Sequence, residues 1–203
     1  MKKVAILAAG CFPKKGGEAR RLLDEADAVV CCDGAADAYR RATGREPVAV
    51  VGDCDSLRGR FSRVVRVGEQ ETNDLEKAAR WCAARGWRRP VVLGATGKRE
   101  DHSIGNVFRA LALGLEVVAD YGRFVPVRGR VSLDVCVGAA VSVFAPDPAT
   151  RMTSEGLEWP LDGVAFENLY CATLNRATAA RVVVAADRPV CVYVAFSGRG
   201  GRS

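Results

Sequence analysis

Short runs of apolar, mostly β-branched residues alternate with amphipathic stretches through residues 1–122. This alternation limits the choice of fold more than any other feature, because strands separated by helices usually pair in parallel. The clearest helix is 73–85, where a residue of Thr72-Asn73-Asp74 can cap the first turn and Gly86 ends the last. We therefore expect an α/β domain built on a parallel sheet. The predicted strands are 4–8, 28–32, 48–51, 64–67, 90–93 and 115–119, and the predicted helices are 18–26, 35–43, 73–85 and 103–113.

Beyond residue 122 the helical periodicity disappears and short β-like segments follow one another. Turn-forming residues separate them, such as Gly129, Gly138 and Asp187-Arg188-Pro189. The pattern predicts a small antiparallel sandwich or barrel as a second domain over residues 123–203, and we expect its Gly-, Arg- and Ser-rich tail, 197–203, to be disordered. The predicted strands are 123–126, 131–136, 140–144, 164–169, 180–184 and 190–196.

The composition is that of a folded protein, because 49% of the 203 residues are hydrophobic and 27% are charged. The net charge of +6 comes from 30 Lys and Arg against 24 Asp and Glu, spread along the chain. Such a balance suits small anionic substrates and nucleic acid equally well.

The apolar runs and the cysteines indicate a cytoplasmic protein. No apolar run is long enough to span a bilayer, and the apolar start, residues 4–9, indicates a strand rather than a signal peptide. Most of the 8 cysteines lie in apolar runs, where a thiol packs as a small apolar group, and no Cys-x-x-Cys pair is present to bind zinc. We therefore expect free thiols, a reducing cytoplasm and no membrane partner.

An acidic loop, Gly52-Asp53-Cys54-Asp55-Ser56, follows the buried run 48–51. Its two carboxylates point to the same side of an extended chain, and they repel each other unless a cation neutralises them. A hard cation such as Mg²⁺ would do so and would also bind substrate phosphates. An ordinary Asp-rich turn, in which Asp53 and Asp55 accept hydrogen bonds from local N–H groups, explains the same residues. The loop alone leaves both interpretations open.

Polar residues follow four of the predicted strands, at the edge where the carboxyl ends of parallel strands meet. Asp33-Gly34 would be an ordinary turn in isolation, but four polar loops at one edge favour a ligand site. The loop Gly94-Ala95-Thr96-Gly97-Lys98-Arg99-Glu100-Asp101-His102 precedes a predicted helix. Its small residues let backbone N–H groups approach an anion, and Arg99 can bind phosphate oxygens through two N–H groups.

Four charged residues beside these loops each have two interpretations. Asp101 can cap the helix that follows it or join the acidic loop at a metal. His102, the only histidine, can contact a ligand or form local hydrogen bonds at the helix start. Asp74 and Lys77 can form a solvated pair one helical turn apart, or they can face the cleft, with Lys77 on a nucleotide and Asp74 on a metal or the ribose. There is no Gly-x-x-x-x-Gly-Lys-[Ser/Thr] or Gly-x-Gly-x-x-Gly motif, so ATP chemistry here would rely on carboxylates and a metal.

Taken together, these segments resemble the thiamine pyrophosphokinase (thiamine diphosphokinase) family over nearly the whole chain. The spaced combination is specific, whereas no single segment is. The resemblance implies a Rossmann-like, parallel-sheet α/β domain that binds ATP (1–122), followed by a small antiparallel β-sandwich domain that binds thiamine and forms a homodimer (123–203). The segments that carry it are Asp33-Gly34-Ala35, Gly52-Asp53-Cys54-Asp55-Ser56, Asn73-Asp74-x-x-Lys77, the loop 94–102 and Thr153-Ser154-Glu155-Gly156-Leu157-Glu158-Trp159-Pro160-Leu161.

The activity implied by the resemblance is a magnesium-dependent transfer of pyrophosphate from ATP to the hydroxyethyl group of thiamine, leaving AMP. Most of the residues that it implicates lie in the first 122 positions. The metal would be held by Asp53 and Asp55, catalysis would involve Asp53, Asp55, Asp101 and Arg99, and the nucleotide would be bound by Asp33, Gly34, Asp74, Lys77, Thr96, Arg99 and His102.

The resemblance also places thiamine against an aromatic ring at Trp159, near Asn175, in a pocket shared between domains across the dimer. Without the resemblance, Trp159 would be expected to be a core aromatic of the sandwich. The sequence departs from the family pattern at several positions. Lys98 stands where a second glycine is usual, Glu71 and Asn73 stand where Asp and Thr are usual, and Thr173 or Leu174 replaces the serine before Asn175.

Two other functions fit parts of the sequence. A metal-dependent phosphohydrolase acting on a nucleotide would use the same carboxylates with water as the acceptor. A basic nucleic-acid-binding protein would use Arg58, Arg60, Arg63 and Arg66 together with the arginines of the tail. The segment 156–159, which carries Trp159, favours an organic acceptor over water, and the acidic residues disfavour a nucleic-acid partner.

Overall fold

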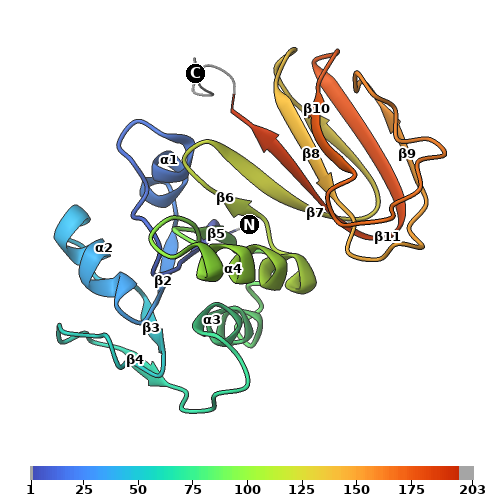
Figure 1. The fold of residues 1–203 in the computed structure, drawn as a ribbon. Coiled ribbons are helices and arrows are strands. Elements are labelled where there is room, and N and C mark those ends of the chain that lie inside the picture. Colours follow the sequence, from blue (N-terminus) through green and yellow to red (C-terminus); the bar gives the residue numbers. More distant parts are fainter. Residues whose placement is uncertain (1, 197–203) are drawn as a thin grey trace. The chain divides into compact units, whose positions relative to one another are not determined.

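The structure is a computed structural model that describes residues 2–196 of the chain. The tail 197–203, which the sequence predicts to be disordered, lies outside the described residues. The chain forms two compact units, Met1–Asp120 and Tyr121–Ser203 (Figure 1). Within the described part of the chain, the helices all belong to the first unit, and the second unit consists of strands and loops.

The first unit is built on parallel strands in the order β4-β3-β2-β1-β5-β6. Every residue of the three central strands β1, β2 and β3 is buried, as a parallel sheet covered on both faces requires. The α/β class predicted from the sequence is confirmed. The strands are β1 (Val4–Leu7), β2 (Ala28–Cys32), β3 (Ala49–Gly52), β4 (Val64–Arg66), β5 (Val91–Leu93) and β6 (Val117–Val118), and the helices are α1 (Glu18–Asp24), α2 (Ala35–Thr43), α3 (Asp74–Ala83) and α4 (Glu100–Leu113).

The order in which the chain adds strands to this sheet reverses at β1, although all the strands remain parallel. The chain runs outward from β1 through β2 and β3 to β4, and then returns through α3 to β5, on the other side of β1. Because such crossovers are right-handed, α1 and α2 lie on one face of the sheet and α3 and α4 on the other (Figure 1). The connections leave β1 and β5 toward opposite faces, so a crevice opens between them at the carboxyl edge.

The second unit is antiparallel and is organised around two long strands, β7 (Gly122–Asp134) and β11 (Arg181–Ala195), which pair along most of their length. The other edge of β11 changes partner along the strand. Its first half pairs with β9 (Met152–Glu155) and its second half with β8 (Ala140–Phe144), which in turn pairs with β10 (Ala172–Arg176). The change falls at an irregularity between Ala186 and Val190, where Pro189 has no N–H to donate.

Several strands predicted for the second unit differ from those observed. The predicted breaks at Gly129 and at 187–189 do not end a strand, because the chain continues through both within β7 and β11. The predicted strand 164–169 is a loop, whose Phe166 is only 2% exposed and anchors it to the core. β9 and β10 are absent from the prediction because polar residues dominate both segments, which read MTSE and ATLNR.

The core of the second unit is made of small and β-branched side chains from the paired strands, with Phe166 as its largest fully buried member. Val141 and Val192, from the paired strands β8 and β11, are both 0% exposed. Burial of these alternate positions on strands is the main favourable contribution to the stability of the unit.

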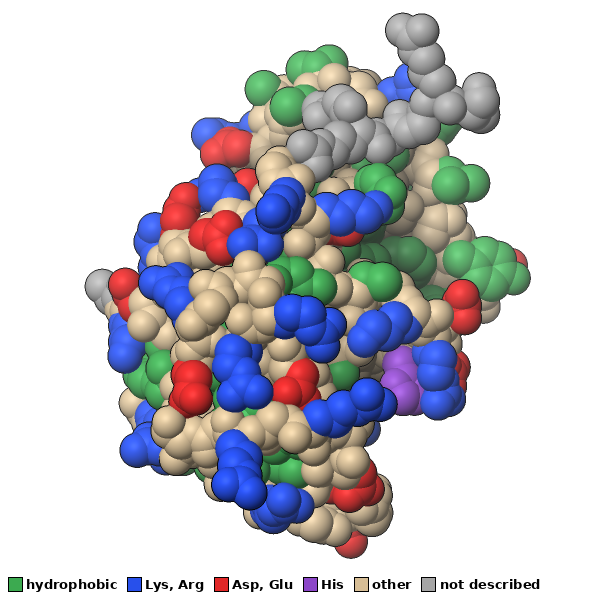
Figure 2. Space-filling view, turned by 90° about the vertical axis from the view of Figure 1, so that its left-hand side faces the viewer, with side chains coloured by type: hydrophobic (Ala, Val, Ile, Leu, Met, Phe, Trp, Pro, Cys, Tyr) green, Lys and Arg blue, Asp and Glu red, His purple; other side chains and the backbone are tan. Residues whose placement is uncertain are grey.

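Charged side chains are mixed over the surface that Figure 2 shows, with Asp and Glu among the Lys and Arg. The eight cysteines all lie within the described residues, and each is a free thiol. Among the helices of residues 2–196, none has the length and apolar character needed to cross a membrane.

Replacement of Phe166 with alanine should destabilise the second unit by about 3–5 kcal/mol, because it leaves a cavity beneath the 164–169 loop. Val137→Ala is the control, since Val137 is 66% exposed and its truncation should change the free energy of unfolding by less than about 0.5 kcal/mol. Urea unfolding followed by circular dichroism measures both. Equal effects of the two substitutions would contradict the described core.

Candidate active site

A cleft of about 600 Å³ lies at the carboxyl edge of the parallel sheet, on the crevice between β1 and β5. The loops that follow these two strands are joined by backbone hydrogen bonds. The Gly10 N–H donates to the Gly94 carbonyl at 2.7 Å, and the Cys11 N–H donates to the Thr96 carbonyl at 2.8 Å. The position agrees with the general location of ligand sites in open α/β sheets. Residues that line the cleft include Gly10, Cys32, Asp53, Thr72, Asn73, Asp74, Lys77, Gly97, Lys98, Arg99, His102 and Asn106.

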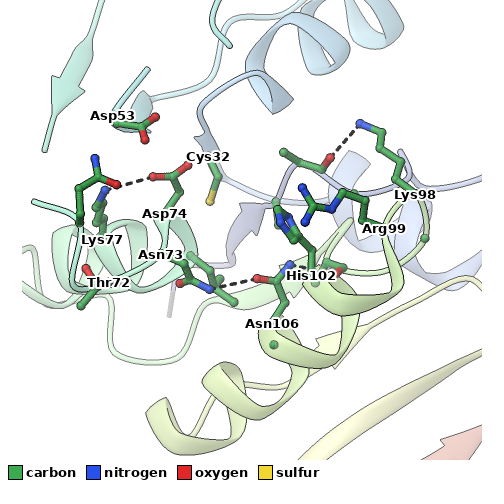
Figure 3. Close-up of a pocket in the computed structure, with 18 of the residues that line it drawn as sticks. Cys32, Asp53, Thr72, Asn73, Asp74, Lys77, Lys98, Arg99, His102 and Asn106 are labelled. Carbon is green, nitrogen blue, oxygen red and sulfur yellow. Dashed lines mark hydrogen bonds and ion pairs between the residues drawn. The ribbon is translucent and has the colours of Figure 1, made fainter. Parts of the chain in front are cut away.

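The acidic wall of the cleft is formed by Asp53, which follows β3, and Asp74, which begins α3. Asp33, which follows β2, lies beside them but is not among the residues that line the cleft. One carboxylate oxygen from each lies within 4.8 Å of the others. Figure 3 shows Asp53 and Asp74 side by side, with Lys77 next to them. Three carboxylates at this spacing repel one another, and the hard divalent cations prefer such an oxygen donor set.

Local hydrogen bonds hold the carboxylates of Asp33 and Asp53. Asp33 is 7% exposed, and its Oδ2 accepts hydrogen bonds from the backbone N–H and the hydroxyl of Ser56, at 3.1 and 2.5 Å. Its Oδ1 is buried without a hydrogen-bond partner among the described residues. Asp53 Oδ1 accepts a hydrogen bond from the Asp55 N–H at 3.3 Å. A buried carboxylate oxygen without a donor, beside two further carboxylates, fits a site for a bound cation.

Asp74 is placed by the first turn of α3. Asn73 caps this helix, since its side-chain oxygen accepts a hydrogen bond from the Glu76 N–H at 3.0 Å. Asp74 also lies close to the backbone of Gly52, where a Cβ atom would come within 2.9 Å of its carboxylate. The Lys77 ammonium, 3.5 Å from Asp74 Oδ1, is almost fully buried and forms an ion pair with this carboxylate. Glycine at position 52 therefore allows the close approach of Asp74 to β3.

Burial and then the negative charge of Asp53 raise the pKa of Asp74, and Lys77 partly opposes them. Because its folded-state pKa is raised, Asp74 binds its proton more readily in the folded protein than in the unfolded chain. Its ionisation therefore destabilises the fold at neutral pH, and that destabilisation is lost as the pH falls through the folded-state pKa. A bound cation would remove the same cost at neutral pH.

The opposite wall consists of the loop between β5 and α4, which carries Lys98 and Arg99, and of the first turn of α4, which carries His102 (Figure 3). Arg99 is exposed and paired with Asp101, with Nη2 donating to Oδ2 at 2.6 Å. This hydrogen bond from the Arg99 guanidinium is the main cause that lowers the pKa of Asp101 to about 2. The His102 side chain is exposed at the rim of the cleft. In the loop between β5 and α4, the backbone carbonyl of Thr96 accepts a hydrogen bond from the backbone N–H of Cys11. The wall thus presents cations and a helix start, which are suited to an anion.

Two asparagines connect the walls. The Asn73 amide donates to the side-chain oxygen of Asn106 at 3.2 Å, and the Asn106 amide donates to the Ala95 carbonyl at 3.1 Å. This relay joins the start of α3 to the β5 loop. Asn106 is missing from the residues predicted from the sequence, although its position four residues after His102 places it on the same face of α4.

The predicted residues of the second unit also come together. Asn175 is 5% exposed, and its side chain both accepts a hydrogen bond from the Trp159 N–H at 3.2 Å and donates one to the Trp159 carbonyl at 2.7 Å. Trp159 itself is 57% exposed, so it is not a core residue. The hydrogen bonds hold the backbone of Trp159 while its ring remains accessible.

The structure brings together some of the site residues predicted in the first unit. Asp33, Asp53 and Asp74 converge, although the sequence predicted Asp53 and Asp55 as the metal pair, and Asp55 is exposed outside this cluster. Arg99 and Asp101 are paired on the opposite wall. Gly34 is the N-cap of α2 and directly follows Asp33, and a Cβ atom at this position would come within 2.7 Å of the Ser56 hydroxyl.

A crevice at a reversal of strand order, with carboxylates on one wall and a glycine-containing basic loop on the other, defines an α/β enzyme of the phosphotransferase class. Residues 19–118 match the family model of the thiamin pyrophosphokinase catalytic domain, and residues 122–193 match that of the thiamin pyrophosphokinase substrate-binding domain. The chain belongs to the thiamin pyrophosphokinase family.

Solved structures share the fold. A thiamine pyrophosphokinase from Bacillus subtilis is 16% identical, with a TM-score of 0.75 over 97% of this chain and 100% of that chain. A thiamin pyrophosphokinase family protein from Enterococcus faecalis is 15% identical, with a TM-score of 0.78 over 97% and 100%. The thiamin pyrophosphokinase from Candida albicans is 13% identical, with a TM-score of 0.77 over 96% and 90%. No curated protein sequence matches the chain significantly.

Replacement of Asp53 with asparagine should lower the pKa of Asp74 in the metal-free protein, because it removes the neighbouring negative charge. Burial should still keep that pKa above its ordinary value. NMR titration of the carboxyl carbons measures the shift. Asp55→Asn is the matched control and should leave the pKa of Asp74 in place, whereas equal shifts from both variants would contradict the convergence of Asp33, Asp53 and Asp74.

Proposed function

We propose that this chain transfers the pyrophosphoryl group of ATP to the hydroxyl of thiamine and releases AMP, in a reaction that requires Mg²⁺. The observation that carries the proposal is the pair of facing walls, one with carboxylates of a three-carboxylate cluster and one with cations, in a chain of this family. The hydroxyl oxygen forms a bond to the β-phosphorus, and the bond between that phosphorus and the oxygen bridging to the α-phosphorus breaks.

Asp33, Asp53 and Asp74 would hold the divalent cation, supported by the unpartnered Oδ1 of Asp33 and the crowding of the three carboxylates. Bound there, the cation would neutralise phosphate charge and polarise a phosphoryl oxygen. Asp55 stays a predicted ligand of the same cation, and its backbone N–H donates a hydrogen bond to Asp53 Oδ1. Oxygen-only donors favour Mg²⁺ over softer metals.

The remaining residues of the cleft bind and orient the phosphates. Lys77 brings a buried positive charge next to the acidic wall, and Arg99 and His102 would act from the other side. Thr96, which is not among the lining residues, stays a predicted contact of the nucleotide. A carboxylate, either Asp55 or Asp101, would accept the proton of the thiamine hydroxyl. Its pairing with Arg99 makes Asp101 a weak base, so its participation requires Arg99 to move toward the phosphates.

Thiamine would stack on the accessible ring of Trp159, whose backbone is fixed by Asn175. This assignment is supported by the substrate-binding family model, which matches the second unit. We further propose the finer architecture that the sequence predicts: a Rossmann-like catalytic domain, 1–122, and a β-sandwich domain, 123–203, in a cytoplasmic homodimer. Sedimentation velocity measures the oligomeric state directly.

Asp53→Asn should reduce AMP formation from ATP, Mg²⁺ and thiamine by at least about a hundredfold, because the acidic wall loses a charge needed to hold the cation. Asp134→Asn, at an aspartate 83% exposed in the second unit, is the control and should keep full activity. Omission of thiamine should abolish AMP formation by the wild type. Nucleotide hydrolysis without thiamine would instead indicate a metal-dependent phosphohydrolase. Binding of nucleic acid without any turnover of nucleotide would indicate a nucleic-acid-binding protein.

Trp159→Ala should raise the KM for thiamine roughly tenfold, the loss expected for one stacking contact, and leave the KM for ATP nearly unchanged. Trp159→Phe should recover most of the loss because it keeps an aromatic face. Tyr170→Ala is a matched control, since Tyr170 is also an exposed aromatic of the second unit, at 67%. Steady-state kinetics with each substrate varied in turn measures these effects, and a similar loss in the Tyr170 variant would refute the assignment to Trp159.

A further inference from the structure

Lys98 occupies a backbone conformation that disfavours lysine. Its φ is +60°, in the left-handed region that glycine or asparagine adopts most readily. Asp33 and Cys54 also have positive φ, at 39° and 64°, and all three residues lie beyond strand ends at the carboxyl edge of the sheet. Strained backbone of this kind is typical of ligand sites, where the surrounding structure compensates for it. The backbone conformation at position 98 therefore does not favour lysine, and the reason for this residue must lie in its side chain.

The Lys98 side chain is held across the mouth of the crevice. Its Nζ donates a hydrogen bond to the Ala9 carbonyl at 2.8 Å, which joins the β5 loop to the β1 loop (Figure 3). The backbone around it is closely packed, since a Cβ at Gly97 would come within 2.5 Å of the Cys11 sulfur. The ammonium is thus fixed at the edge of the cleft although the residue is exposed.

The charge of Lys98 is not neutralised by a carboxylate. The other two long cationic side chains of the cleft have acidic partners: Arg99 pairs with Asp101, and Lys77 pairs with Asp74. Among residues 2–196, the polar partner of the Lys98 ammonium is a neutral carbonyl. An ammonium has three protons to donate, and this bond uses one of them. Two donors and a full positive charge therefore remain for an anion in the cleft.

We propose that Lys98 is a further phosphate-binding residue of this chain, which contacts the triphosphate of the nucleotide from the wall opposite the carboxylates. The bond to Ala9 positions the ammonium, so that the phosphates meet a charge already fixed at the cleft. The assignment of ATP as the ligand rests on the proposed function. The inference that Lys98 binds a polyphosphate chain does not depend on that function.

The test compares Lys98→Met, which removes the charge and keeps the length of the side chain, with Lys98→Arg, which restores a charge. Calorimetric titration with ATP and Mg²⁺ should show roughly tenfold weaker binding for Lys98→Met, as for loss of a charge-assisted hydrogen bond. Lys98→Arg should recover most of this loss. The dissociation constant should also depend less steeply on salt concentration in Lys98→Met than in the wild type, a change that a purely structural role would not produce.

Lys15→Met is the matched control, because it removes the same charge from an exposed lysine outside the cleft lining. Equal weakening by Lys15→Met and Lys98→Met, or a loss that Lys98→Arg fails to recover, would overturn the proposal. Inorganic triphosphate, titrated in the same way, separates this result from the proposed function. A wild type that binds triphosphate but forms no AMP from thiamine would refute the proposed function, and the comparison of Lys98→Met with Lys98→Arg would still decide the role of Lys98.

Discussion

The convergence of three carboxylates at one edge of the sheet is the constraint on which the first unit depends. Asp33, Asp53 and Asp74 repel one another, and each is compensated differently. Ser56 donates two hydrogen bonds to Asp33, a turn satisfies Asp53, and the start of α3 together with buried Lys77 offsets the charge of Asp74. The raised pKa of Asp74 indicates that this compensation is incomplete. The fold therefore keeps unfavourable electrostatic energy at the position where a cation can relieve it.

The reversal of strand order at β1 gives this charge distribution its function. It places the loops after β1 and β5 side by side, and their backbone hydrogen bonds fix the basic wall relative to the strands. The relay from Asn73 through Asn106 to Ala95 then ties that wall to the helix that carries Asp74. The carboxylates and the cations are thereby held apart on opposite walls of the cleft. A phosphate chain with a bound metal would be complementary to both, its metal to the carboxylates and its phosphates to the cations.

Much of the first unit could be predicted from the sequence, because buried parallel strands and amphipathic helices have distinct periodicities. The helix predicted at 35–43 is observed as Ala35–Thr43, and Gly10, Asp53 and Gly97, which lie in the loops after β1, β3 and β5, line the cleft. The composition of the carboxylate cluster could not be predicted, since the spacing of Asp53 and Asp55 shows proximity along the chain only. Asp74 joins Asp53 through a tertiary contact with Gly52, for which the sequence carries no periodic signal.

The second unit was harder to predict because its strands bend and exchange partners. A bulge at 187–189 resembles a turn in the sequence, and Phe166 in a loop resembles a strand residue, since both patterns depend on pairing between distant segments. The contact between Trp159 and Asn175 likewise joins segments that are 16 positions apart. The resemblance to a family identified these two residues, whereas local periodicity alone would have predicted a buried tryptophan.

The hydrogen bonds of Asn175 to both backbone groups of Trp159 have a consequence for recognition. An exposed tryptophan on a free loop would lose backbone and side-chain entropy when a ligand stacks on it, and that loss would weaken binding. Here the backbone is already ordered in the folded protein, so mainly the ring torsions remain to be restricted. Part of the entropic cost of capturing a flat aromatic molecule is therefore met when the chain folds.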